Sequence, residues 1–248
     1  MHTITSLQND LRAMGIRPDD TLLIHSSMKS IGAVENGADG VLDALIQYFV
    51  PGGGLLVFPT LTYHLNVENP FFVVEETAGI VGLLPELFRK RPGVKRSWHP
   101  THSVAAIGEG AAEFLAGHHL FDSPCAPTSP WGKLIDRKAK ILFIGTGIIC
   151  NTFLHGVEEI AQVPGMLTEE PQQLCTIAPD GTRYAVPSRR HLGHHSTWYE
   201  KIRQDFETDG VLIQGRFGDA RCDLGDAAGM AETALRNLRQ DPLYFTHF

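Results

Sequence analysis

The chain has 248 residues, of which 43% are hydrophobic and 20% are charged, a balance typical of a globular protein rather than a disordered or collagenous one. Its 21 basic and 28 acidic residues give a net charge of −7 without a long basic run, which argues against binding nucleic acid through its phosphates. The apolar runs are too short to span a membrane and no signal-peptide pattern is visible, so we expect a cytoplasmic protein without a membrane partner.

Helical and strand-like patterns alternate along the chain. Residues 4–14 carry apolar side chains at helical spacing, and the short apolar run at residues 21–24 predicts a strand. The same two patterns recur, and they predict helices over residues 41–49, 80–91 and 223–240, and strands over residues 55–59, 103–107, 140–144 and 211–213. This alternation predicts an α/β fold with a central, mostly parallel sheet flanked by helices.

No linker, repeat or low-complexity tract divides the sequence, so we expect one α/β domain over residues 1–248. Residues 164–200 follow a less regular pattern than the rest of the chain. Within them, Asp180 and Gly181 form a typical turn dipeptide, which predicts a β-hairpin at that point.

Three polar loops follow predicted strands, at residues 25–31, 60–64 and 145–152. The first has hydroxyl, backbone N–H and ammonium groups that suit a phosphate or an amide, in the sequence His25-Ser26-Ser27-Met28-Lys29. In open α/β sheets, ligands bind at the loops beyond the carboxyl ends of the strands. We therefore expect these loops to assemble one binding site.

Two further stretches hold side chains suited to catalysis. His155 lies three residues before Glu158 and four before Glu159, so these side chains share one face if a helix has begun. A carboxylate beside an imidazole fixes its tautomer and stabilises its protonated form, as a general base requires, although an ordinary surface pair has the same spacing. The second stretch places two imidazoles, His99 and His102, just before a strand, where they could equally cap backbone groups.

Five stretches carry a resemblance when they are taken together. They are residues 22–32, residues 54–60, residues 92–108 with His99-Pro100-Thr101-His102, residues 129–134 with Ser129-Pro130-Trp131-Gly132, and residues 151–155 with Glu158. In this order they resemble the aminoglycoside 3-N-acetyltransferase family, an antibiotic N-acetyltransferase type that is not of the GNAT kind. Each stretch alone is weakly specific, whereas five in order are highly specific, and they cover most of residues 5–165.

The resemblance implies an α/β enzyme that transfers an acetyl group from acetyl-CoA to a primary amine of an aminoglycoside or a similar small molecule, as in antibiotic resistance. It implies that the co-substrate acetyl-CoA is held by Ser26, Ser27, Met28, Ser103 and Val104, with Arg96 as a phosphate partner. His155 resembles the family's general base, with Glu158 beside it and His99 in the same hydrogen-bonded network. Direct transfer to the amine needs no nucleophilic residue, and no metal is expected.

The sequence also departs from the drug-modifying members of the family. Where those members carry an acidic Phe-Asp-Pro segment and a Thr-Pro-Ser, residues 69–79 read Asn-Pro-Phe-Phe-Val-Val-Glu-Glu-Thr-Ala-Gly. Because polycationic acceptors need carboxylates, this change puts the aminoglycoside, rather than the acetyl transfer, in question. Residues 164–200 depart as well. We expect them to help line the acceptor side, with His191, His194 and His195 at the surface or at its rim.

Other functions stay open at this point. His99, His102 and His155 could hold the metal of a hydrolase, and a non-catalytic homologue could keep a CoA cleft. Cys125 or Cys150 could act as a nucleophile beside His155, although nothing else in the sequence marks either thiol as activated. The sequence does not give the oligomeric state, for which a homodimer is one candidate.

Overall fold

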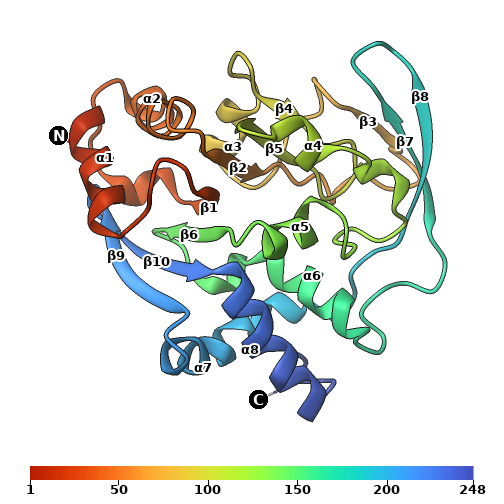
Figure 1. Ribbon diagram of the computed structural model, residues 1–248. Coiled ribbons are helices and arrows are strands. Elements are labelled where there is room, and N and C mark those ends of the chain that lie inside the picture. Colours follow the sequence, from red (N-terminus) through yellow and green to blue (C-terminus); the bar gives the residue numbers. More distant parts are fainter. Residues whose placement is uncertain (248) are drawn as a thin grey trace.

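A seven-stranded sheet forms the centre of the computed structural model, which describes residues 1–247 (Figure 1). Its strands lie in the order β4-β5-β2-β1-β6-β10-β9. They span Thr21–Ser26 (β1), Leu55–Pro59 (β2), Lys95–Arg96 (β4), Val104–Gly108 (β5), Lys140–Ile144 (β6), Leu212–Phe217 (β9) and Ala220–Asp226 (β10). Strands β2, β1 and β6 pair in parallel and the outer pairs are antiparallel, so only β5 and β10 run against the other strands. The expected α/β class with a mostly parallel sheet is confirmed.

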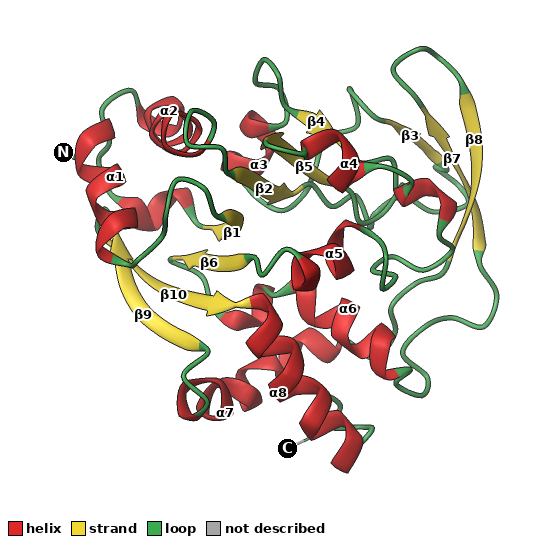
Figure 2. Ribbon diagram, viewed as in Figure 1, coloured by secondary structure: helices red, strands yellow, loops and turns green. Residues whose placement is uncertain are grey.

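The central strands bury side chains on both faces of the sheet. Along β1, Leu22 and Ile24 point to one face and Leu23 to the other, and all three are fully buried. The first face is covered by α1 (Ile4–Ala13), α2 (Gly37–Phe49) and α3 (Leu83–Phe88). The second face is covered by α4 (Ala111–Leu115), α5 (Pro130–Asp136), α6 (Thr152–Ala161), α7 (Arg203–Thr208) and α8 (Ala227–Gln240). The sheet is thus the middle of three layers (Figure 2).

A second, three-stranded sheet lies beside the β4 end of the central sheet (Figure 1). It consists of β3 (Phe71–Val73), β7 (Gln172–Ile177) and β8 (Arg183–Ser188), with β7 in the middle. Strands β7 and β8 form the predicted hairpin, in which the side chain of Asp180 accepts the N–H of Thr182 and Gly181 has a φ of +82°. The hydroxyl of Thr176 donates to the carbonyl of Trp98, which ties β7 to the loop after β4.

Short 3₁₀ helices occupy several of the loops, at Met28–Ile31 (η1), His118–Leu120 (η2), Ile148–Cys150 (η3) and His195–Ile202 (η4). Two predicted helices proved shorter than expected. Residues 220–226 pair with β6 and β9, so the helix predicted from residue 223 begins only at Ala227, where Asp226 caps it by accepting the N–H of Gly229. Helix α3 starts at Leu83 because Pro85 has no N–H to bond to an earlier helical turn.

None of the helices within residues 1–247 combines the length and the apolar character that crossing a bilayer would require.

Candidate active site

The carboxyl ends of the three parallel strands open onto one cavity of about 550 Å³. The carboxyl end of β1 and the loops after β2 and β6 contribute to its wall, in the region where an α/β sheet is expected to bind ligands. The end of β1 supplies His25 and Ser26, and the loop after β2 supplies Leu61 and Tyr63. The rest of the wall comes from Pro59, Val81, His102, Thr146, His155 and residues 149–152, 190–192 and 194–196.

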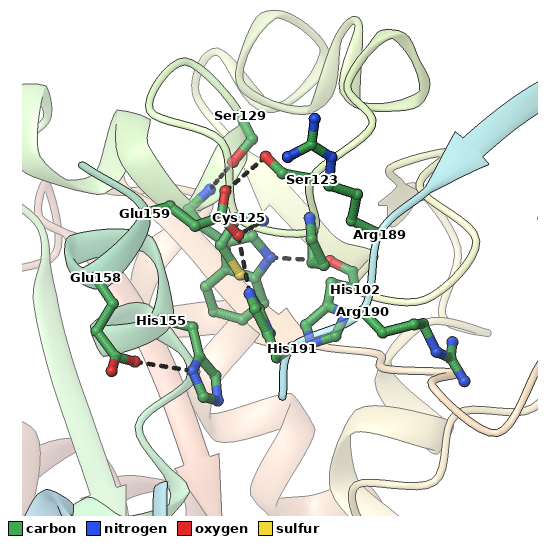
Figure 3. A network of polar contacts seen from close by, with 12 residues as sticks. His102, Ser123, Cys125, Ser129, His155, Glu158, Glu159, Arg189, Arg190 and His191 are labelled. Carbon is green, nitrogen blue, oxygen red and sulfur yellow. Dashed lines mark hydrogen bonds and ion pairs between the residues drawn. The ribbon is translucent and has the colours of Figure 1, made fainter. Parts of the chain in front are cut away.

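Helix α6 carries the predicted catalytic pair. His155 and Glu158 share one face of the helix, and Nδ1 of His155 lies 3.1 Å from Oε2 of Glu158 (Figure 3). The hydroxyl of Tyr199, from η4, lies 2.7 Å from the same Nδ1 and donates to Oε2 of Glu158 at 2.5 Å. Because a carboxylate can only accept, Nδ1 carries the proton of the neutral imidazole. The lone pair of Nε2 is therefore free, on a ring that lines the cavity.

Glu158 is fully buried, yet its surroundings favour the ionised form. Nδ1 of His195 donates to its second carboxylate oxygen at 2.5 Å. Burial alone would raise the pKa of Glu158, but the hydrogen bonds from His155, His195 and Tyr199 outweigh it and hold that pKa at about 2. An ionised carboxylate in this position fixes the tautomer of His155 and stabilises the imidazolium that forms when His155 accepts a proton.

The neighbouring carboxyl group has the opposite character. Burial raises the pKa of Glu159 to about 7, although the hydroxyl of Ser123 and the N–H of Cys125 donate to it at 2.6 and 2.8 Å. The loop with these two donors comes close because Gly156 of α6 has no side chain, and a Cβ there would lie 3.3 Å from the carbonyl oxygen of Cys125. Glu159 also contacts Nε2 of His191 at 2.9 Å (Figure 3). Because burial disfavours the charged form of both groups, this contact is a hydrogen bond of a largely uncharged pair.

Imidazole rings continue from His155 into the protein. The ring of His155 stacks on His191 with a centroid distance of 4.3 Å, and His191 meets the edge of His102 at 5.0 Å. His99 follows, 6.4 Å from His102, and is completely buried. Its Nδ1 accepts the N–H groups of Thr101 and His102, so His99 reaches His155 only through the intervening rings. Burial holds the pKa of His99, His102 and His191 well below the usual value, and these rings are neutral.

The residues expected to hold acetyl-CoA separate into two groups. Ser26 lines the cavity, and its hydroxyl has no hydrogen-bond partner. Ser27 and Met28 follow directly, with the hydroxyl of Ser27 bonded to Ser30 and Met28 at the start of η1. Ser103 and Val104, in contrast, are buried at the start of β5 and do not line the cavity.

Arg96 is held by a set of hydrogen bonds within the protein. All three of its guanidinium nitrogens donate to protein oxygens, namely the carbonyls of Thr60, Val74 and Thr77 and the hydroxyls of Thr60 and Ser103. It lines a separate cleft beside β4 instead of the cavity that holds His155. In this position its side chain ties the loops after β2 and β3 to β4, and a contact of Arg96 with a phosphate of CoA stays a prediction.

Two residues of the site were missed or misplaced by sequence reasoning. Tyr199 was not singled out, and His195 was expected at the surface or at the acceptor rim; it lines the cavity, but it is only 3% exposed and hydrogen-bonded to Glu158. Both belong to η4, whose residues lie about 40 positions beyond Glu158 in the sequence, so no local spacing connects them with α6. The one available signal was the concentration of histidines at 191, 194 and 195.

Within residues 1–247, potential metal ligands also gather at Cys125, Glu159 and His191, whose ligand atoms lie within 4.8 Å of one another. This group differs from the His99, His102 and His155 set of the hydrolase alternative. Burial, helped by the nearby carboxyl groups, raises the pKa of Cys125 well above its usual value, which disfavours the thiolate that binds metals.

Comparison with known proteins identifies the family. A family model described as aminoglycoside 3-N-acetyltransferase matches residues 23–239. The chain is 33% identical to aminoglycoside N(3)-acetyltransferase VII of Streptomyces paromomycinus, over 93% of this chain and 89% of that protein. It is 30% identical to aminoglycoside N(3)-acetyltransferase IV of Salmonella sp, over 97% of this chain and 89% of that protein.

Solved structures agree with this assignment. The fold is similar to that of AAC-IIIb in a binary complex with CoASH, with a TM-score of 0.84 and 26% identity over 96% of this chain and 97% of that one. It is also similar to a histidine-to-alanine variant of AAC(3)-IVa in complex with a gentamicin, with a TM-score of 0.85 and 28% identity over 99% of this chain and 92% of that one. The chain therefore belongs to the aminoglycoside 3-N-acetyltransferase family, as its sequence motifs indicated.

Proposed function

We propose that this protein is an acetyl-CoA-dependent N-acetyltransferase that acetylates a primary amine of an aminoglycoside or a similar amine-bearing small molecule, with His155 as the general base. One observation carries the proposal: His155 lines the cavity with a free Nε2, while its Nδ1 is fixed by the ionised Glu158. Membership of the family, and the CoASH complex of the similar protein AAC-IIIb, support acetyl-CoA as the donor.

The chemistry requires a base because an ammonium group has no lone pair. As the amine nitrogen attacks the thioester carbonyl, Nε2 of His155 accepts a proton from it and becomes an imidazolium that Glu158 stabilises. The C–N bond forms, the C–S bond breaks, and the departing thiolate takes the proton from His155 to give CoASH and the amide. The neutral state of His191, next to His155, avoids a second positive charge beside this imidazolium.

Polar atoms without partners mark the part of the cavity proposed for the thioester end of acetyl-CoA. Nε2 of His25, the hydroxyl of Ser26 and the hydroxyl of Thr146 are buried without a hydrogen bond, and all three residues line the cavity. Buried polar groups without partners are uncommon in proteins, so we infer that they bond to the co-substrate. We keep Ser26, Ser27 and Met28 as residues of the acetyl-CoA site.

The variant His155→Ala tests the proposal, with acetyl-CoA, a panel of amines that includes aminoglycosides, and a thiol-detecting dye. We expect kcat to fall by about 10²–10⁴ while CoA still binds, because only the proton acceptor is removed. His64→Ala is the matched control, since His64 is exposed and outside the cavity wall. Undiminished turnover by His155→Ala would remove His155 from this role. Failure of the wild-type protein to release thiol with any amine would favour a non-catalytic CoA-binding homologue.

A further inference from the structure

The wall of the cavity carries charge of only one sign. Among its lining residues, all of which belong to the described part of the chain, there is no aspartate or glutamate, and Arg190 is the one arginine or lysine. Several lining histidines are neutral, since burial lowers the pKa of His25 to about 3 and the pKa of His102 and His191 well below the usual value. A bound molecule therefore meets one permanent cation and no carboxylate.

Arg190 lacks a charge partner. Its Nη2 donates to the carbonyl of Tyr63 at 2.7 Å, while Nη1 is buried without any hydrogen-bond partner. It forms no ion pair with another described residue. The preceding residue, Arg189, pairs with Asp122 at 3.0 Å, and the two guanidinium groups point in different directions (Figure 3). A partly buried guanidinium with an unused N–H group is a ready site for an oxyanion.

The carboxyl groups nearest to the cavity cannot hold an ammonium group of a ligand. Glu158 is fully buried and already accepts three hydrogen bonds, from His155, His195 and Tyr199. The side chain of Glu159 is 4% exposed, and its oxygens are bonded to Ser123, Cys125 and His191. Neither faces the open space. A polycation in the cavity would therefore gain no salt bridge there and would be repelled by Arg190.

The net charge of −7 attracts cations to the molecule as a whole and works against this preference. Interactions of exposed charges are, however, largely screened beyond about 8 Å at physiological salt. A partly buried cation inside the cavity is screened much less. The local charge at Arg190 therefore outweighs the distant surface charges in selecting the bound molecule.

We propose that the acceptor is a primary amine that also carries an acidic group, a carboxylate or a phosphonate, which pairs with Arg190 while the amine faces His155. This inference rests on the proposed function and narrows its acceptor class. Arg190 is a specificity-determining residue in this arrangement, and it takes no part in the proton transfer.

A matched series of acceptors tests the inference. It comprises ω-amino acids of three to six carbons, the corresponding ω-aminoalkylphosphonates, the amides of the same amino acids, and gentamicin as the polycation. Each is assayed with acetyl-CoA for thiol release, and products are weighed by mass spectrometry. Equilibrium binding of each acceptor to the enzyme–CoA complex is measured by calorimetry. The proteins are the wild type, Arg190→Met, which keeps the apolar stem but removes the charge, and the control Arg189→Met, which lies outside the cavity wall.

We expect kcat/KM for the best acidic acceptor to exceed that of its amide by about 10- to 100-fold. Arg190→Met should abolish this preference through the KM of the acceptor while leaving the KM of acetyl-CoA within about twofold. Arg189→Met should keep the preference.

Three results would overturn the inference and leave the proposed function intact: equal use of acids and amides, a preference for gentamicin over the acidic acceptors, or an Arg190→Met effect confined to the KM of acetyl-CoA. Binding of acidic amines that depends on Arg190, without acetylation of any amine, would support the inference about the site and refute the proposed function. The two hypotheses can thus fail separately.

Discussion

Replacing Glu158 by glutamine tests the electrostatic role of the residue that holds the proposed base. The substitution removes the negative charge but nearly preserves the shape of the side chain. In the folded protein this carboxylate accepts hydrogen bonds from His155, His195 and Tyr199. A carboxamide can accept at one end only, so one of these three donors then faces an N–H group.

The size of the effect follows from the difference between charged and neutral hydrogen bonds. A hydrogen bond to a charged group contributes about 1.5–3 kcal/mol, and one between neutral groups about 0.5–1.5 kcal/mol. The imidazolium formed at His155 should thus lose about 1–2 kcal/mol, which lowers kcat by about 5- to 30-fold.

The value of kcat comes from steady-state thiol release, with thermal unfolding to show that the variant is folded. Glu232→Gln provides a matched control, because Glu232 is exposed on α8, away from the cavity. A Glu158→Gln protein with a kcat within twofold of the wild type would refute the electrostatic argument.

Three other substitutions give independent checks. Tyr199→Phe removes one donor from Glu158, and we expect kcat to fall about 3- to 10-fold and the unfolding free energy by about 1 kcal/mol, measured by kinetics and urea denaturation. Burial raises the pKa of Glu159 from 4.5 to about 7, so its ionisation destabilises the fold increasingly as the pH rises between those values. The free energy of unfolding of Glu159→Gln, relative to that of the wild type, should therefore increase by about 2–3 kcal/mol from pH 5 to pH 8. An equal difference between the two proteins at both pH values would contradict this. Gly145→Ala should lower the free energy of unfolding by at least about 2 kcal/mol, because the φ of Gly145 is +61° and a Cβ there would lie 2.2 Å from Cβ of Ser30. An unchanged melting temperature would contradict this.

The layers of the fold could be predicted because the central strands are apolar and their helices follow at short intervals. Residues 22–24, 55–59 and 141–144 are buried on both faces, and such runs are visible without knowledge of their neighbours. Strand β10 was not predicted because its pattern mixes arginine, aspartate and glycine with cysteine and leucine. Its conformation depends on pairing with β6 and β9, which local sequence does not record.

The candidate site shows the same division between local and distant information. His155 and Glu158 are three residues apart on one helix, so their contact could be predicted from spacing. The donors that keep Glu158 ionised, His195 and Tyr199, come from η4 and depend on how the chain returns to α6. The hydrogen bonds of Arg96 could not be predicted, because a sequence shows a charge but not the carbonyl groups that surround it.

Helix α6 places two buried carboxyl groups side by side, and their surroundings drive their pKa values apart. The pKa of Glu158 is held at about 2 by hydrogen bonds from His155, His195 and Tyr199, while burial raises the pKa of Glu159 to about 7. Two full negative charges on adjacent residues would repel each other and lose their hydration. Near neutral pH Glu159 is therefore only partly ionised, while the full charge lies on Glu158, the residue that contacts His155. This division gives the proposed base an ionised partner, and no ionised carboxylate is left in the cavity wall to attract a polycationic acceptor.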